Sequence, residues 1–274
     1  MTATGSIGCN VDLVVLYANI QVQELGNEGI IYAEFGNNKH SQVSKGTNLK
    51  KRFIRVDGKK QASTRRFDNS ITIKYNLKVD DNSCTTLNIK VFKNGKIQMT
   101  GVKSESIGKR AIDDLIGLIK EYQTTSEDKI VEDVNELESS SFCIHLINSD
   151  FKVNMEIRRD LLANLIINKY AITCSYEPCI YPGVKLQYFL NKNNNKGLPL
   201  VEQGRCTCCP PCNGKGDGFT TNTCKKITIS IFQSGCILIT GVTLIQHIQI
   251  AYNYITELIK RHENDIKRVK LVIE

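Results

Sequence analysis

Residues 86–92 and 226–232 alternate strictly between aliphatic and polar side chains, and each segment ends in a phenylalanine, Phe92 or Phe232. A period of two predicts a strand with one buried face and one open face. The Asn-Gly or Ser-Gly pair that follows each segment predicts a tight turn into a second strand. The sequence therefore predicts two β-hairpins, each with an aromatic residue on the polar face beside its turn.

A helix is predicted after each hairpin, because apolar residues recur there at helical spacing. The stripe expected to pack against the first sheet comprises Ile107, Ala111, Leu115, Leu118, Ile119 and Tyr122. The second expected stripe comprises Ile245, Ile248, Tyr252, Ile255 and Ile259. We expect both stripes to be core, without a role of their own.

The hairpin and its helix occur twice at a constant offset, without a gap. Residues 91–102 share Phe, Gly, Ile and Thr-Gly-Val with residues 231–242, and Leu-Ile-Lys at 118–120 returns at 258–260. A match at fixed period indicates duplicated structural units. Two copies of one unit favour a pseudo-twofold molecule suited to a twofold-like ligand such as a DNA duplex. A duplicated fold without such a function is the alternative.

A further strand is predicted over residues 14–22, with Asn19 and Gln21 on its polar side. Helices that cover one face of an antiparallel sheet leave the other face open. The predicted open face is rich in amides, hydroxyls and lysines. It also places an aromatic residue beside each hairpin turn, although single exposed phenylalanines are common.

Length and composition indicate a globular chain. The 274 residues are enough for one large or two small domains, and 41% of them are hydrophobic. No apolar run approaches the roughly 20 residues of a membrane span. The first residues lack the basic and then apolar layout of a secretory signal. We therefore expect an intracellular protein without membrane association.

Charge is unevenly distributed along the chain, whose net charge is +8. The segment 39–66 is strongly basic, with Asp57 as its single acid, and the segment 127–138 is strongly acidic. A basic block is typical of a polyanion partner or of a solvated loop, and both interpretations stay open. The acidic segment is interpreted as a solvated linker between the two repeats.

Five of the eleven cysteines crowd into one segment. They are Cys206, Cys208, Cys209, Cys212 and Cys224. Four of these thiolates would suit a tetrahedral zinc ion, although the spacing fits no standard zinc motif. Disulfides and free thiols are the alternatives, and the absence of a secretory signal disfavours disulfides.

No catalytic motif is apparent. The histidines at 40, 145, 247 and 262 are scattered without carboxylates or cysteines at catalytic spacing. The sequence has neither a phosphate-cradling glycine-rich loop nor a nucleophile motif. We therefore expect a binding protein, not an enzyme.

Three segments resemble the TATA-box-binding protein family. Ser175–Gly183 (SYEPCIYPG) and Ile231–Val242 (IFQSGCILITGV) resemble motifs of that family's second repeat, and Lys90–Glu105 resembles the matching part of the first. Arg65–Phe67 stands where the family has Lys-Arg-Phe. The divergence and the insertions are most like the TATA-binding-protein-like factors of large DNA viruses.

The resemblance implies an α+β fold: a pseudo-twofold saddle with a curved antiparallel sheet and helices on its convex face. It implies a first repeat over 11–122, an acidic linker over 123–141, a second repeat over 142–262 and a tail over 263–274. A Cys-rich insertion, 190–225, has no counterpart in the family. It interrupts the strands that follow Tyr181 and precede Phe232, so we expect it at the opposite end of that hairpin.

The resemblance also implies a DNA site. Aromatic pairs that push between base steps would be Phe67 with Phe92 and Tyr181 with Phe232. Phe53 competes with Phe67, because Phe67 requires a β-bulge to reach the groove. Amides, hydroxyls and lysines suit the acceptors and phosphates of a minor groove. The expected groove and phosphate contacts are Asn19, Gln21, Lys90, Lys96, Gln98, Thr100, Lys185 and Thr240.

The implied role is transcription initiation on AT-rich double-stranded promoter DNA, with basal transcription factors and RNA polymerase as partners. Glu177 matches a position that contacts a bridging factor, and a simple exposed turn carboxylate is its alternative. We expect a monomer that needs no cofactor for DNA binding, in the nucleus, at a cytoplasmic viral replication site or packaged in a virion. The alternative function is a saddle-fold scaffold for protein partners or single-stranded nucleic acid.

Overall fold

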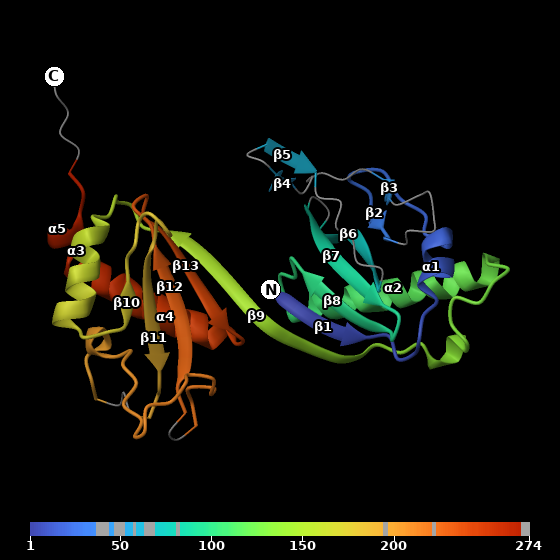
Figure 1. Ribbon diagram of the computed structural model, residues 1–274. Coiled ribbons are helices and arrows are strands. Elements are labelled where there is room, and N and C mark those ends of the chain that lie inside the picture. Colours follow the sequence, from blue (N-terminus) through green and yellow to red (C-terminus); the bar gives the residue numbers. More distant parts are fainter. Residues whose placement is uncertain are drawn as a thin grey trace. The chain divides into compact units, whose positions relative to one another are not determined.

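The computed structural model describes residues 1–36, 44–46, 53–56, 59–62, 69–80, 83–193, 197–220 and 223–269. The chain divides into two compact units, Met1–His145 and Leu146–Glu274 (Figure 1). Each unit combines an antiparallel sheet with helices, which confirms the predicted α+β class. The first unit begins before residue 11, and it includes the whole of the 123–141 segment.

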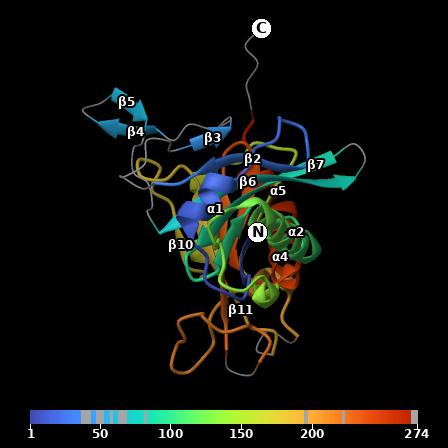
Figure 2. The ribbon, with the colours of Figure 1, turned by 90° about the vertical axis from the view of Figure 1, so that its right-hand side faces the viewer.

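The first unit contains a sheet in the order β9-β1-β8-β7-β6-β2-β3, and neighbouring strands β7, β6 and β2 are visible together in Figure 2. Its elements are β1 (Thr2–Ser6), α1 (Leu13–Asn19), β2 (Gly29–Glu34), β3 (Ser44–Gly46), β6 (Ser70–Asp80), β7 (Ser83–Phe92), β8 (Lys96–Thr100), α2 (Glu105–Thr125), the short helix η1 (Val134–Glu136) and the first half of β9 (Ser140–Lys152). Among the described residues, the strands β4 (Phe53–Val56) and β5 (Lys59–Ala62) pair only with each other.

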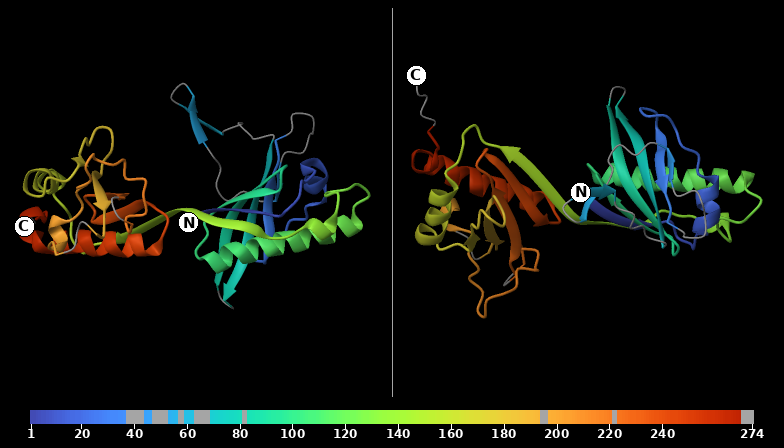
Figure 3. Two further views of the ribbon diagram at one scale, coloured as in Figure 1. Left: turned by 90° about the horizontal axis from the view of Figure 1, so that it is seen from below. Right: turned by 45° about the horizontal axis from the view of Figure 1, so that its top comes forward.

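The predicted alternation positions α2 on one face of this sheet. Leu87, Ile89 and Val91 are fully buried in the same core as the helix residues Ala111 and Leu115. The helix lies along that face of the sheet (Figure 3). Ser104 caps its start by accepting a hydrogen bond from the N–H of Ile107. The predicted stripe of the first helix is therefore confirmed, and the opposite face of the sheet is left open.

The predicted strand over residues 14–22 is wrong, because residues Leu13–Asn19 form helix α1. The side chain of Asp12 accepts hydrogen bonds from the N–H groups of Val14 and Val15 and so caps the helix. The buried positions Leu13, Leu16, Tyr17 and Ile20 follow helical spacing. Strand β1, which pairs with β8, was not predicted.

The second unit repeats the arrangement with a sheet in the order β10-β11-β12-β13-β9. Its elements are the second half of β9, α3 (Arg159–Asn164), the π-helical turn η2 (Leu165–Lys169), β10 (Cys174–Ser175), β11 (Val184–Leu190), the short helix η3 (Leu200–Glu202), β12 (Lys225–Ile231), β13 (Cys236–Val242), α4 (Ile245–Arg261) and α5 (Glu263–Ile266). The predicted turn is confirmed at Gly235, whose φ of 81° favours glycine.

The predicted stripe of the second helix is only partly correct. Ile255 and Ile259 are buried as expected, but Ile245 is 65% exposed and Tyr252 is 40% exposed. The buried face of α4 instead comprises His247, Ala251, Tyr254, Ile255, Leu258 and Ile259. The helix carries apolar residues on two faces, so spacing alone did not identify the packed one. Among the described helices, none has the length and apolar composition required to cross a membrane.

The acidic segment after α2 is anchored to the first unit. Ile130, Val131 and Leu137 are buried in its core. The N–H of Asp12 donates to the carbonyl of Ile130, at 2.8 Å. The segment thus exposes its carboxylates, as expected of a solvated linker, while its apolar residues pack into the core of the first unit.

Candidate nucleic-acid interface

Two aromatic rings meet at one end of the second unit's central hairpin. Strands β11 and β12 pair from Val184 opposite Ile231 to Leu190 opposite Lys225. Tyr181 precedes the first of these pairs and Phe232 follows it, so both residues lie at the same end. Their ring centroids are 5.8 Å apart with an interplanar angle of 61°, an edge-to-face contact. Both side chains are half-buried.

Close packing beneath the Tyr181–Phe232 pair depends on Gly183. A Cβ atom at residue 183 would lie 2.9 Å from Cε1 of Tyr181 and 3.2 Å from Cε1 of Phe232. Any larger residue would therefore push the rings apart. The ammonium group of Lys185 lies 4.8 Å from the Tyr181 ring centroid, which adds a cation–π contact on the exposed side.

Arg159, at the start of α3, connects the two turns that carry these rings. Its guanidinium donates to the carbonyl of Pro182 and, at 3.2 Å, to Oε1 of Gln233. It also lies 5.3 Å from the ring centroid of Tyr176. Sequence reasoning missed this residue, because its position before a short helix gives no sign of contacts made so far along the chain.

The open face of the second sheet is mixed in character. Strand pairing places Lys185, Ser230, Leu238 and Asp150 in one row across β11, β12, β13 and β9. Thr240 is half-buried and pairs with Thr228. The exposed carboxylate of Asp150 was not anticipated. It reduces the positive charge of a face that otherwise offers hydroxyl, amide and ammonium groups.

The open face of the first sheet is more uniformly polar. One row contains Thr72, Lys90, Gln98 and Thr4, in neighbouring strands β6, β7, β8 and β1. The next contains Lys74, Asn88, Thr100 and Thr2. Within the described strands β1, β7 and β8, this face carries no carboxylate. On the neighbouring strand β2, however, Glu34 pairs with Thr72, so the first row also carries one carboxylate, which accepts a hydrogen bond from the Tyr32 hydroxyl at 2.9 Å.

A hollow of about 820 Å³ lies at the end of this face. Phe92 lines it and is half-buried, beside Lys96, Gln98 and Thr4. The hydroxyl of Thr4 is 2.7 Å from Nε2 of His145 on β9. Sequence reasoning missed Thr4 and Ser6, although hydroxyl residues at 2, 4 and 6 alternate with small ones. That alternation is the signal that identifies β1.

Two predicted DNA contacts fall elsewhere. Asn19 lies on α1, where its amide donates to the carbonyl of Val15 at 2.9 Å and to the hydroxyl of Ser126 at 3.1 Å. Gln21 follows that helix, and its N–H donates to the Tyr122 hydroxyl of α2 at 3.4 Å. Both residues are therefore on the helical side of the sheet, and their placement on the open face is wrong. Phe67 lies outside the described residues.

A curated protein of Acanthamoeba polyphaga mimivirus, described as TATA-box-binding protein-like, is 28% identical to the chain over 288 residues. The match covers 99% of the chain and 66% of that protein. The resemblance to TATA-box-binding proteins is confirmed. Among solved structures, a chain described as Methanococcus jannaschii TBP matches with a TM-score of 0.45 and 15% identity, over 95% of this chain and 94% of that one. No protein-family model matches the chain.

Glu177 is exposed in the turn that leads to the Tyr181–Phe232 pair. Its carbonyl accepts hydrogen bonds from the N–H groups of Ile180 and Tyr181, both at 2.9 Å. The carboxylate therefore stands on an ordered turn, next to Ile180, which is 81% exposed. A role of Glu177 in binding a transcription partner stays a prediction.

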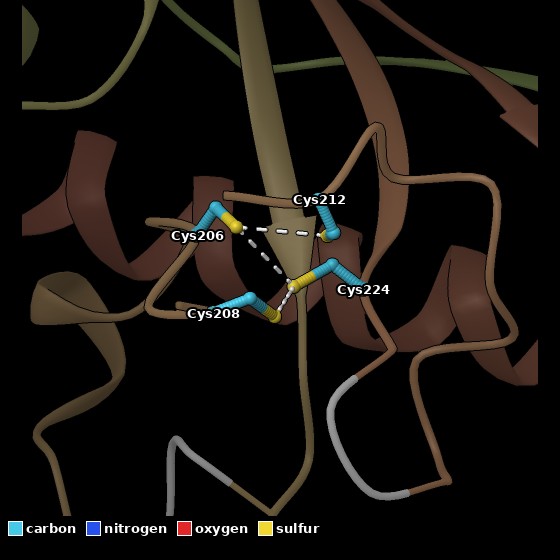
Figure 4. A group of neighbouring side chains, drawn as sticks. All are labelled: Cys206, Cys208, Cys212 and Cys224. Carbon is cyan, nitrogen blue, oxygen red and sulfur yellow. Dashed lines mark hydrogen bonds between the residues drawn. The ribbon is translucent and has the colours of Figure 1, made fainter. Parts of the chain in front are cut away.

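The other end of the β11–β12 hairpin carries the Cys-rich insertion, as predicted. The Sγ atoms of Cys206, Cys208, Cys212 and Cys224 all lie within 4.8 Å of one another and face a common centre (Figure 4). Among the described residues, Cys209 does not belong to this group, and the Cys209 side chain is exposed. The structure thus selects four of the five predicted candidates.

The backbone around the cluster favours a thiolate at Cys212. Burial opposes ionisation, but hydrogen bonds from the N–H groups of Gly214 and Cys224, together with the neighbouring thiols, lower the pKa of Cys212 below its usual value. The segment 213–216 also pairs with the start of β12, with the N–H of Gly216 donating to the carbonyl of Cys224 at 2.9 Å. The site is therefore built on the sheet.

Proposed function

We propose that the chain is a transcription initiation factor that binds duplex DNA in the minor groove and bends it. The open faces of the two sheets would contact the groove, and the aromatic residues beside the hairpin turns would enter between base steps. The Tyr181–Phe232 pair is the observation that carries the proposal. An edge-to-face pair of half-buried rings at the end of a sheet offers apolar surface that can replace stacking between two bases.

The chemistry of the first sheet supports the same mode of binding. The minor groove presents acceptors at A·T pairs, which hydroxyl and amide donors such as Thr4, Gln98 and Thr100 can satisfy. Lys90 and Lys96 would neutralise phosphates along its borders. These contacts need no cofactor. A preference for AT-rich promoter DNA would come mainly from the lower cost of deforming flexible TA steps.

Titration of three nucleic acids at one fixed salt concentration tests this proposal. A TATA-containing duplex, a GC-rich duplex of equal length and the corresponding single strand would each carry a fluorophore, and anisotropy would report binding. We expect the TATA duplex to bind at least tenfold more tightly than either of the others. Equal affinity for all three would favour a single-strand binder that uses the sheet as a stacking platform. No binding to any of them would favour a protein scaffold.

We further propose that the chain is a monomer and that its partners are basal transcription factors and RNA polymerase. Glu177 would form one of the partner contacts. We propose no catalytic activity for the chain. It would act inside the cell, in the nucleus or at a cytoplasmic viral replication site. Sedimentation of the chain with and without DNA would check the monomeric state. A stable dimer in the absence of DNA would contradict it.

A further inference from the structure

The four-cysteine cluster has the dimensions of a metal site. Sγ of Cys206 lies 3.6 Å from that of Cys212 and 3.8 Å from that of Cys224, and the sulfurs of Cys208 and Cys224 are 3.5 Å apart. Four sulfurs placed tetrahedrally at about 2.3 Å from a zinc ion are about 3.8 Å from one another. A disulfide instead holds its two sulfurs at about 2 Å. The spacing thus fits coordination of one ion by all four thiolates.

The surroundings of the cluster are those of a closed site. Cys224 is buried at the start of β12, and the other three thiols are half-buried. All four ligand positions of a tetrahedral ion would be occupied by protein, which is typical of structural zinc and leaves no place for a reacting water. Soft thiolates without oxygen ligands also disfavour magnesium and calcium.

We infer that Cys206, Cys208, Cys212 and Cys224 bind one structural zinc ion that fastens the insertion to the second unit. Binding forms four Zn–S bonds and releases the proton of each ligand thiol that is still protonated, without a change of oxidation state. The resulting centre carries two negative charges. Arg205, Lys215 and Lys225 flank the ligands along the chain and would offset that charge.

The insertion has little regular structure, and a metal centre would add to its other attachments to the second unit. Within the described residues 197–220 the one helical element is η3. Beyond the cysteines, Val201 of η3 is buried, and the N–H groups of Phe189 and Lys192 donate to the carbonyls of Gly204 and Gly218, both at 2.9 Å. The Phe219 ring stacks on His247 of α4 at 5.1 Å, and the Asp217 carbonyl lies 2.8 Å from Nε2 of His247. A zinc centre would link residues 206–212 of the insertion to Cys224, which immediately precedes β12.

Metal analysis of the full chain, purified without added zinc or chelator, tests the inference. Native mass spectrometry should find one zinc ion per chain in the wild type and in Cys209→Ser, the matched control. Cys206→Ser and Cys212→Ser should each lose it. In the wild-type chain, a thiol-alkylating reagent should spare these four cysteines until a chelator is added. That second measurement needs no variant and so does not depend on how well the variants fold.

Two results would overturn the inference. One is a chain without zinc in which all eleven cysteines react with the alkylating reagent before chelation. The other is a disulfide among the four residues that survives in the purified protein. A DNA-binding assay distinguishes failure of the zinc inference from failure of the proposed function, because the Tyr181–Phe232 pair lies at the other end of the hairpin from the cysteines. Chelation should release the insertion to limited proteolysis and change duplex affinity less than twofold.

Discussion

Arg159 shows how a single side chain can position the proposed DNA-contacting rings. Its guanidinium holds the turn of Pro182 and the turn of Gln233 at once, and those turns carry Tyr181 and Phe232. Hydrogen bonds from a charged guanidinium are stronger than those between neutral groups. Because these two bonds reach separate turns, they stabilise the position of one turn relative to the other. Arg159 is therefore a positioning residue, which contacts the turns that carry the two rings.

Arg159→Ala should loosen the Tyr181–Phe232 pair without removing either ring. Loss of two charge-assisted hydrogen bonds is expected to lower the unfolding free energy of the second unit by about 1–3 kcal/mol. Duplex bending, measured by energy transfer between the ends of a labelled TATA duplex, should decrease while binding persists. Arg158→Ala is the matched control, since Arg158 is half exposed and its one ion pair is a 3.9 Å contact with Asp160. Equal effects of the two substitutions would contradict the positioning role.

Asp150 places a negative charge on the second open face and would oppose the proposed DNA binding there. Its exposed carboxylate shares a row with Lys185 and Ser230. Asp150→Asn removes the charge and keeps the shape, so we expect a two- to fivefold gain in duplex affinity, about 0.4–1 kcal/mol at low salt. Anisotropy titrations at two salt concentrations would measure it. Glu257→Gln, on the helix α4, serves as the control, and an unchanged or weaker affinity of Asp150→Asn would place this row outside the interface.

At the scale of elements, both predicted hairpins are confirmed, whereas helix α1 was taken for a strand and β1 was missed. Strict alternation identified β7, β8, β12 and β13, because a sheet with one packed face imposes a period of two. Residues 13–20 are nearly all apolar, so both periods fit them, and only the cap at Asp12 distinguishes the helix. The insertion's position followed from the resemblance, which identified the two interrupted strands, together with their antiparallel pairing. Which four cysteines meet depends on the path of the loop, which spacing does not specify.

The contact between α4 and the insertion should depend on pH. Burial, and secondarily the nearby Lys225, lowers the pKa of His247, although the hydrogen bond to the Asp217 carbonyl opposes the shift. A folded-state pKa below the unfolded value of about 6.5 means that unfolding takes up protons. The stability contribution is therefore complete above about pH 6.5 and is lost as the pH falls below it.

Hydrogen exchange of the Phe219 and Thr220 amides would measure this effect. We expect protection to decrease between pH 7 and pH 5 in the wild type, beyond the intrinsic change in exchange rate. His247→Gln, which keeps a donor for the Asp217 carbonyl but does not titrate, should show a smaller decrease. Because any metal at the cysteines would respond to acid in both proteins, their difference isolates the histidine. Identical decreases would rule out His247 as the cause.

At the scale of the whole molecule, duplication explains why one chain would carry two similar halves of a DNA site. Each unit presents the open face of an antiparallel sheet, with Phe92 at the end of one and the Tyr181–Phe232 pair at the end of the other. The resemblance predicted these positions because motif residues at strand ends keep their register. It did not predict Thr4 or Asp150, which reach the open faces through strand pairing. It also did not predict Arg159, whose hydrogen bonds join two turns. The insertion adds a feature without altering the ring-bearing end of the hairpin.

Bending of a TATA-containing duplex by the purified chain tests the central claim most directly. Energy transfer between fluorophores on the two ends should rise when the wild type or Tyr252→Ala binds, Tyr252 being a partly exposed aromatic on α4. The double variant Tyr181→Ala with Phe232→Ala should bind at least tenfold more weakly and should bend the duplex much less, while its thermal unfolding stays close to that of the wild type. Full bending by the folded double variant, or a duplex left straight by the bound wild type, would contradict the account.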